Sequence, residues 1–197
     1  MNLLEQYLET YESLQEMKGD LLESSAISQE TTDYIFEGSD LTKYNWEGLN
    51  DKGKMRELQS VEDKLAKIEG RESITIEAHE PSFIEKIRTW ATGGGKTMGY
   101  FDPNTHKIFI NADLLKSGEN IKELVDTVAH EGIHAYQQDC VEGKVKHYNP
   151  EEVEIWRENI LNYKPAQIYG YGIYRHQPIE EMAFSRGSVI ANSYQYV

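Results

Sequence analysis

The chain of 197 residues contains a single cysteine, Cys140. No disulfide can therefore form within the chain, and folding does not depend on oxidation. Apolar runs are only a few residues long, whereas a membrane-spanning helix needs about 20 apolar residues. Basic residues are also scarce, with 20 Lys and Arg against 34 Asp and Glu and a net charge of −14. This balance argues against nucleic acid or an anionic membrane as a partner, because both are bound through positive patches.

The first residues lack a basic stretch followed by an apolar one, so we expect no cleavable secretory signal. The protein is then expected to be cytoplasmic, or exported by a route that needs no cleavable signal. Hydrophobic residues make up 39% of the chain, which is enough to bury a core. The length suits one ordinary domain with a helical appendage.

Hydrophobic periodicity predicts an α+β protein in which a small sheet lies between helical segments. We divide it into an N-terminal helical extension, residues 1–45, and a domain over residues 46–197. The predicted helices cover residues 2–24, 55–69, 81–90 and 120–140, with two more opening at Asn149-Pro150 and near Pro178. The predicted strands cover residues 72–77, 97–101 and 106–111, while residues 25–53 and 163–175 are expected to connect elements.

The strongest functional signal is His130-Glu131-Gly132-Ile133-His134, an H-E-x-x-H sequence on a predicted helix. Residues four apart lie on one helix face, so the imidazoles of His130 and His134 can share one metal ion. Glu131 lies at the edge of that face, where it can reach a water molecule without binding the metal. Gly132 is a weak helix former, and its small size would allow another segment to approach closely.

A catalytic zinc ion needs a third protein ligand and a free position for water. Cys140 is one candidate, although a buried structural thiol is the simpler interpretation of this residue. The better candidates are the adjacent carboxylates Glu180 and Glu181 at the start of the last helix. They project about 100° apart, so only one of them can face the metal. Acidic residues in a first turn also simply complement the helix dipole.

H-E-x-x-H together with Glu180-Glu181-Met182-Ala183 resembles the zincin metallopeptidases, in particular the glutamate-zincin (gluzincin) branch, which carries E-x-x-A on a later helix. The match makes Glu180 the preferred ligand over Glu181. Over about residues 45–190 the chain is also similar to small metallopeptidase domains of bacterial polymorphic-toxin systems. One departure is Phe184, which stands where many relatives have an aspartate. That change removes a carboxylate that could hydrogen-bond a ligand histidine.

The resemblance implies a zincin-like fold: a small mixed sheet, the H-E-x-x-H helix and flanking helices. It implies a Zn²⁺ ion held by His130, His134 and Glu180, and hydrolysis of peptide bonds by a zinc-bound water with Glu131 as general base. Tyr174 and His176 are the preferred donors to the oxyanion. An extended peptide would pair with the strand at 97–101 or at 106–111.

Protein or peptide substrates are therefore expected, and an inhibitor or immunity protein as a partner if the chain is a toxin-type effector. Two other interpretations stay open from the sequence. One is a binding or regulatory module that keeps the zinc site without catalysing a reaction. The other is a structural zinc site whose fourth position is closed by a protein ligand.

Overall fold

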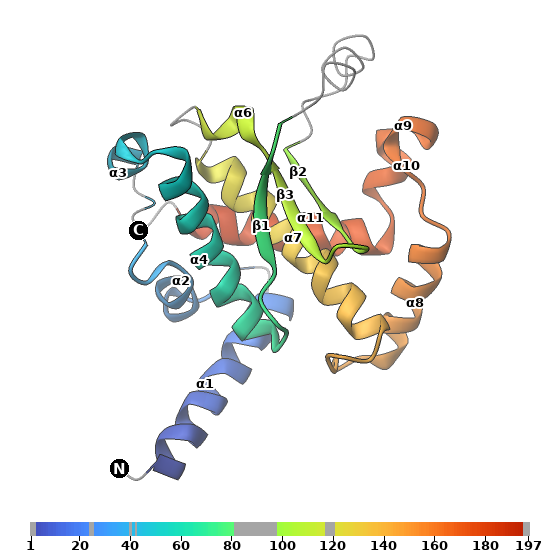
Figure 1. The fold of residues 1–197 in the computed structure, drawn as a ribbon. Coiled ribbons are helices and arrows are strands. Elements are labelled where there is room, and N and C mark those ends of the chain that lie inside the picture. Colours follow the sequence, from blue (N-terminus) through green and yellow to red (C-terminus); the bar gives the residue numbers. More distant parts are fainter. Residues whose placement is uncertain are drawn as a thin grey trace.

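The computed structural model describes residues 3–23, 26–39, 41, 43–80, 98–116 and 121–194. The helices are α1 (Leu3–Glu23), α2 (Gln29–Phe36), α3 (Lys43–Gly48), α4 (Asp51–Glu69), α6 (Ala112–Leu115), α7 (Ile121–Val141), α8 (Pro150–Leu161), α9 (Ala166–Tyr169), α10 (Tyr171–Arg175) and α11 (Pro178–Ser193). The strands are β1 (Thr75–His79), β2 (Gly99–Asp102) and β3 (Lys107–Asn111) (Figure 1). The α+β class is thus confirmed. The helix expected over residues 81–90 lies outside the described residues.

The three strands form a mixed sheet in the order β1-β3-β2. Strand β3 is central, pairing parallel with β1 and antiparallel with β2. The amide of Asn111 donates to the carbonyl of Met98 at 2.9 Å, which makes that pair a hydrogen-bonded one. Because such pairs alternate along an antiparallel ladder, the backbone groups of Gly99 and Phe101 face the edge of β2 that no described strand occupies, called its free edge below.

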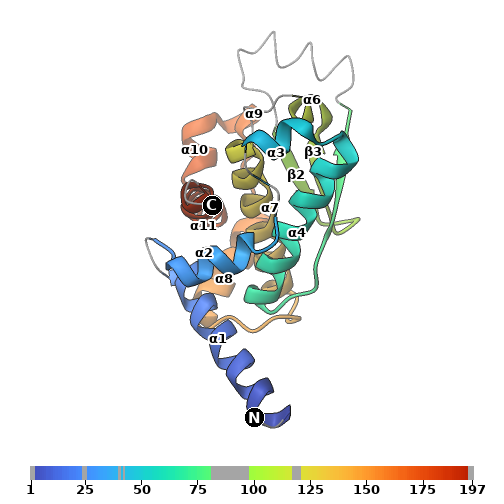
Figure 2. The ribbon, with the colours of Figure 1, turned by 90° about the vertical axis from the view of Figure 1, so that its left-hand side faces the viewer.

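Helices α4 and α7 cover one face of the sheet, and α11 lies on the far side of α7 (Figure 2). Every second residue of the strands points into this layer, where Ile76, Ile108 and Ile110 are buried. Their branched side chains remove apolar area from water against the buried residues of α7, at about 25 cal/mol per Å². The sheet and α7 are therefore held at a fixed separation.

Three helix ends follow the local sequence closely. The side chain of Asn50 accepts a hydrogen bond from the amide of Gly53 at 2.9 Å and caps α4. Gly70 ends α4 with φ +76°, a left-handed conformation that favours glycine. The side chain of Asn149 likewise caps α8, which has Pro150 in its first turn. The end of α4 at residue 69 and the start of α8 at Asn149-Pro150 were predicted and are confirmed, whereas α4 begins at Asp51, four residues before the predicted start at residue 55.

The two segments expected to be connections contain short helices. Residues 25–53 include α2 and α3, and residues 163–175 include α9 and α10. Helix α2 forms because Ser28 caps it and because Ile35 and Phe36 enter the core. Helices this short gain little from intrinsic propensity, so their tertiary contacts decide the outcome.

Helix α1 projects from the body at its N-terminal end, as both views show (Figures 1 and 2). Its last turns are different, since Met17, Leu21 and Leu22 are buried in the same core cluster as residues of α4 and α7. The division of the chain near residue 45 stays a prediction. None of the helices within the described residues is long and apolar enough to cross a membrane.

Candidate metal centre

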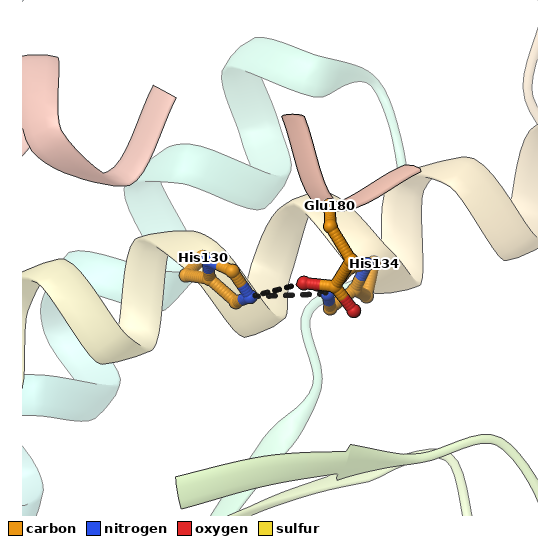
Figure 3. A group of neighbouring side chains, drawn as sticks. All are labelled: His130, His134 and Glu180. Atoms are coloured by element: carbon orange, nitrogen blue, oxygen red, sulfur yellow. Dashed lines mark hydrogen bonds and ion pairs between the residues drawn. The ribbon is translucent and has the colours of Figure 1, made fainter. Parts of the chain in front are cut away.

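The H-E-x-x-H sequence lies in the middle of α7, as predicted. One helical turn separates His130 from His134, and their Nε2 atoms are 3.1 Å apart (Figure 3). His130 is buried, with 8% of its surface exposed, and His134 is half-buried. The two ring nitrogens therefore converge on one point beside the helix.

Glu180 completes this group from the first turn of α11. Its Oε2 atom is 3.4 Å from Nε2 of His130 and 3.5 Å from Nε2 of His134. Helix α11 reaches α7 closely at Gly187, where an added Cβ would lie 2.8 Å from Oδ1 of Asp126 and 3.3 Å from Cβ of His130. A glycine at this crossing thus allows Glu180 to reach the histidines.

The geometry fits a metal ion. With zinc bonds about 2.0–2.1 Å long, ligand atoms of a tetrahedral site lie about 3.3–3.4 Å from one another. The three distances between His130, His134 and Glu180 match that edge length closely. Oε2 of Glu180 is buried and makes no hydrogen bond to the described residues. A buried carboxylate oxygen without a hydrogen bond is costly, and a cation would satisfy it.

Two side chains, which no sequence pattern singled out, orient these ligands. Oε1 of Gln137 lies 3.0 Å from Nδ1 of His134, so Nδ1 carries the proton and Nε2 faces the metal position. Nε2 of Gln137 donates to the carbonyl of Ile179 at 3.1 Å and joins α7 to α11. The hydroxyl of Tyr163 donates to Oε1 of Glu180 at 2.7 Å, which leaves Oε2 as the ligand atom.

The electrostatics favour a charged carboxylate in this group. Burial alone would raise the pKa of Glu180, but the neighbouring imidazoles of His130 and His134 and the hydrogen bond from Tyr163 hold it well below its usual range. Burial would lower the pKa of His134, but the carboxylates of Glu180 and Glu131 raise it to about 9. Only the neutral imidazole binds a metal, so a metal ion must displace this proton.

Glu131 is not part of the ligand group. Its Oε2 accepts a hydrogen bond from the amide of Phe101 at 2.8 Å, on the free edge of β2. Strand β2 lies close to α7, since a Cβ added to Gly99 would lie only 2.8 Å from Cγ2 of Thr127 on α7. The structure therefore brings the predicted general base, the predicted ligands and the edge strand together.

The two residues predicted to stabilise an oxyanion are placed differently. Tyr174 is half-buried beside the site, and burial together with the charge of Glu180 raises the pKa of its hydroxyl. This hydroxyl stays protonated at neutral pH and can donate. His176 is exposed, and its Nδ1 lies 2.7 Å from the carbonyl of Gly172. Its catalytic role stays a prediction.

Phe184, which stands in place of the aspartate that the family resemblance leads one to expect, contacts His130 directly. The ring centroids are 4.5 Å apart with planes at 71°. The guanidinium carbon of Arg175 lies over the Phe184 ring, 4.2 Å from its centroid. An aromatic contact therefore restrains the His130 ring where a hydrogen bond to a carboxylate could have done so.

Gly132 does allow a close approach, as its small size suggested. An added Cβ would lie 3.0 Å from Nη2 of Arg71. The guanidinium of Arg71 is fully buried and bonds Glu62 and Glu69, each at 2.5 Å. Helix α7 thus packs at Gly132 against the buried cluster of Arg71, Glu62 and Glu69, which fixes the position of the H-E-x-x-H turn.

Cys140 is not part of the metal group among the described residues. Burial raises the pKa of its thiol to about 11, and the residue is 5% exposed. We therefore expect Cys140 to resist maleimide at pH 7.5 in the native protein and to react within minutes in denaturant, because the thiolate is the nucleophile. Mass spectrometry of the adduct measures this, and Cys140→Ala should leave the zinc content unchanged. Loss of zinc in that variant would make the thiol a ligand.

Comparison of the chain with family models, with curated proteins and with solved structures found no match.

Proposed function

We propose that this protein is a zinc-dependent metallopeptidase of the gluzincin type, with a zincin-like fold. The single observation that carries the proposal is the convergence of His130, His134 and Glu180 on one point. Two imidazoles and one carboxylate suit zinc better than magnesium or calcium, which prefer oxygen ligands. When bound, zinc would supply the positive charge that polarises the scissile carbonyl and lowers the pKa of water.

The protein's own side chains would do the rest. Glu131 would accept a proton from the attacking water and return it to the leaving amine, as a general base and acid. The hydrogen bond from Phe101 holds Oε2 of Glu131 and leaves the other oxygen to accept the proton. Tyr174 is the better placed of the two proposed oxyanion donors, since its hydroxyl is beside Glu180.

The substrate would be an extended peptide paired with β2. The alternative considered from the sequence, the strand at 106–111, corresponds to β3, which is paired on both sides. Strand β2 has a free edge, and the backbone groups of Gly99 face it. Adding a strand there would place the peptide backbone next to Glu131.

The similarity to toxin-system peptidases extends the proposal to partners and location. A toxin-type effector would be bound by an inhibitor or immunity protein. It would act in the cytoplasm or be exported without a cleavable signal. Its substrates would be proteins or peptides.

Metal removal tests the proposal. We expect purified protein to contain about one zinc per chain and to hydrolyse a mixture of unfolded proteins. Dialysis against a chelator should abolish hydrolysis, and added Zn²⁺ should restore it, while Mg²⁺ should not. Elemental analysis and mass spectrometry of the products measure both parts. Full hydrolysis by metal-free protein would contradict the proposal.

A further inference from the structure

The segment from Leu161 to His176, called the arm below, exposes an unusual amount of apolar surface. Neither α9 nor α10 contains a buried residue. Eleven large apolar or aromatic side chains are exposed within the described residues, and six of them belong to the arm. They are Leu161, Tyr163, Ile168, Tyr169, Tyr171 and Ile173. A cluster of this kind marks an interaction site more often than isolated exposed residues do.

The arm is fastened at its base. Gln177 is 5% exposed, and its side chain binds both backbone groups of Lys164. Oε1 accepts from the amide of Lys164 at 2.7 Å, and Nε2 donates to its carbonyl at 3.0 Å. Asn159 donates to the same Oε1 at 3.1 Å. The apolar side chains are therefore presented from a fixed base, which lowers the entropy cost of binding.

The base of the arm is continuous with the metal centre. Tyr163 donates to the ligand Glu180 at 2.7 Å. The ring of Tyr174 lies 6.0 Å from the ring of Phe184, which in turn contacts His130. A polypeptide that occupies the centre would therefore meet the arm next. In Figure 1 the arm stands beside the end of α11 that carries Glu180, on the same side of the molecule as β2.

Charge indicates what the arm binds. Residues 159–179 contain no Asp or Glu, and they include Lys164, Arg175 and His176. The whole chain has a net charge of −14, so the arm is a basic and apolar element on an acidic protein. Carboxylates would be attracted to this element and repelled by most of the remaining surface.

We propose that the arm binds an acidic, apolar stretch of the polypeptide substrate and thereby determines which peptide bonds are hydrolysed. This inference rests on the proposed peptidase function. An anionic membrane is the other surface to which basic and apolar loops bind, but it would be repelled by the net charge of the chain. Two Lys or Arg residues are also fewer than the 4–8 that basic lipid-binding clusters contain.

Binding of three fluorescein-labelled peptides tests the inference, with zinc-loaded Glu131→Gln protein so that nothing is cleaved. One peptide alternates Leu with Glu, the second Leu with Lys, and the third Ser with Glu. The variant Ile168→Ser/Tyr171→Ser removes apolar contacts, and Lys164→Glu reverses one charge. The matched control is Ile155→Ser, which alters a 49%-exposed isoleucine of α8 outside the arm. Zinc content and circular dichroism establish that each variant is folded.

The Leu/Glu peptide should bind most tightly, and its Kd should rise about tenfold or more in the double variant. Lys164→Glu should weaken that peptide and strengthen the Leu/Lys peptide, and Ile155→Ser should change neither. Unchanged Kd in the arm variants would overturn the inference, as would preference for the Leu/Lys peptide. Binding to phosphatidylserine vesicles without binding to any peptide would overturn it as well. Cleavage by the wild-type chain is scored separately, so arm-dependent binding without cleavage would contradict the peptidase function, and with it the choice of peptide bonds by the arm, but would leave the binding of acidic, apolar peptides by the arm in place.

Discussion

Replacement of Glu131 by glutamine should lower kcat about 10²–10⁴-fold, while the protein keeps its zinc. Glutamine has the shape of glutamate. Its amide oxygen can still accept the hydrogen bond from the Phe101 amide, which is 2.8 Å long in the wild-type protein. The variant cannot accept a proton from water. Because Glu131 is not one of the three converging ligands, the metal affinity should change little. Peptide hydrolysis under saturating substrate and elemental analysis measure the two effects.

Glu123→Gln is the matched control, since Glu123 is an exposed carboxylate on the same helix, two turns before Glu131. It should leave both kcat and zinc content unchanged. Wild-type turnover by the Glu131 variant would contradict the assigned general base. If the wild-type protein and the Glu131 variant both contained zinc and the wild-type protein hydrolysed no peptide, the non-catalytic binding module would be favoured.

The sequence was most informative where a local pattern determines the geometry. Helix period alone places His130 and His134 on one face of α7, and the structure brings their nitrogens within 3.1 Å. Gly70 likewise ends α4 at the predicted boundary through local capping. Such features depend on neighbours within a few residues, so they can be recognised without knowing the fold.

The supporting contacts could not be recognised in that way. Gln137 joins His134 to the backbone of Ile179, 42 residues later, and Tyr163 binds Glu180 from a separate loop. Their contacts depend on how α11 crosses α7, and glutamines and tyrosines are common in loops and on surfaces. One signal was available for Tyr163, since it lies in the loop where oxyanion donors were sought.

The order of the strands in the sheet could likewise not be predicted from local sequence patterns. Two strands were candidates for pairing with a substrate, and only the position of β3 between β1 and β2 decides between them. Pairing between strands is non-local and depends on which faces become buried. A short helix such as α2 also depends on tertiary context, because about two turns gain little from propensity.

The choice between Glu180 and Glu181 leads to the second large effect. Glu180→Gln should weaken zinc binding more than about 100-fold, beyond the 10–100-fold typical for loss of an outer hydrogen-bond partner. The amide oxygen of the glutamine can still accept the hydrogen bond from the Tyr163 hydroxyl, which is 2.7 Å long in the wild-type protein. The side chain at position 180 therefore keeps its place. What is lost is the negative charge at Oε2, which lies 3.4 Å from Nε2 of His130 and 3.5 Å from Nε2 of His134. Competition with a fluorescent zinc chelator measures the affinity.

Glu181→Gln is the control, because it removes the neighbouring carboxylate from the same first turn of α11. Glu181 is exposed, whereas Glu180 is 1% exposed. Both variants lose the same interaction with the helix dipole, worth about 0.3–1 kcal/mol. A difference between them therefore isolates the contribution of the ligand. If Glu181→Gln lost zinc while Glu180→Gln kept it, Glu181 would be the ligand. Helix α11 would then have to be rotated about its axis relative to its orientation in this structure, and the assignment of Glu180 would be wrong.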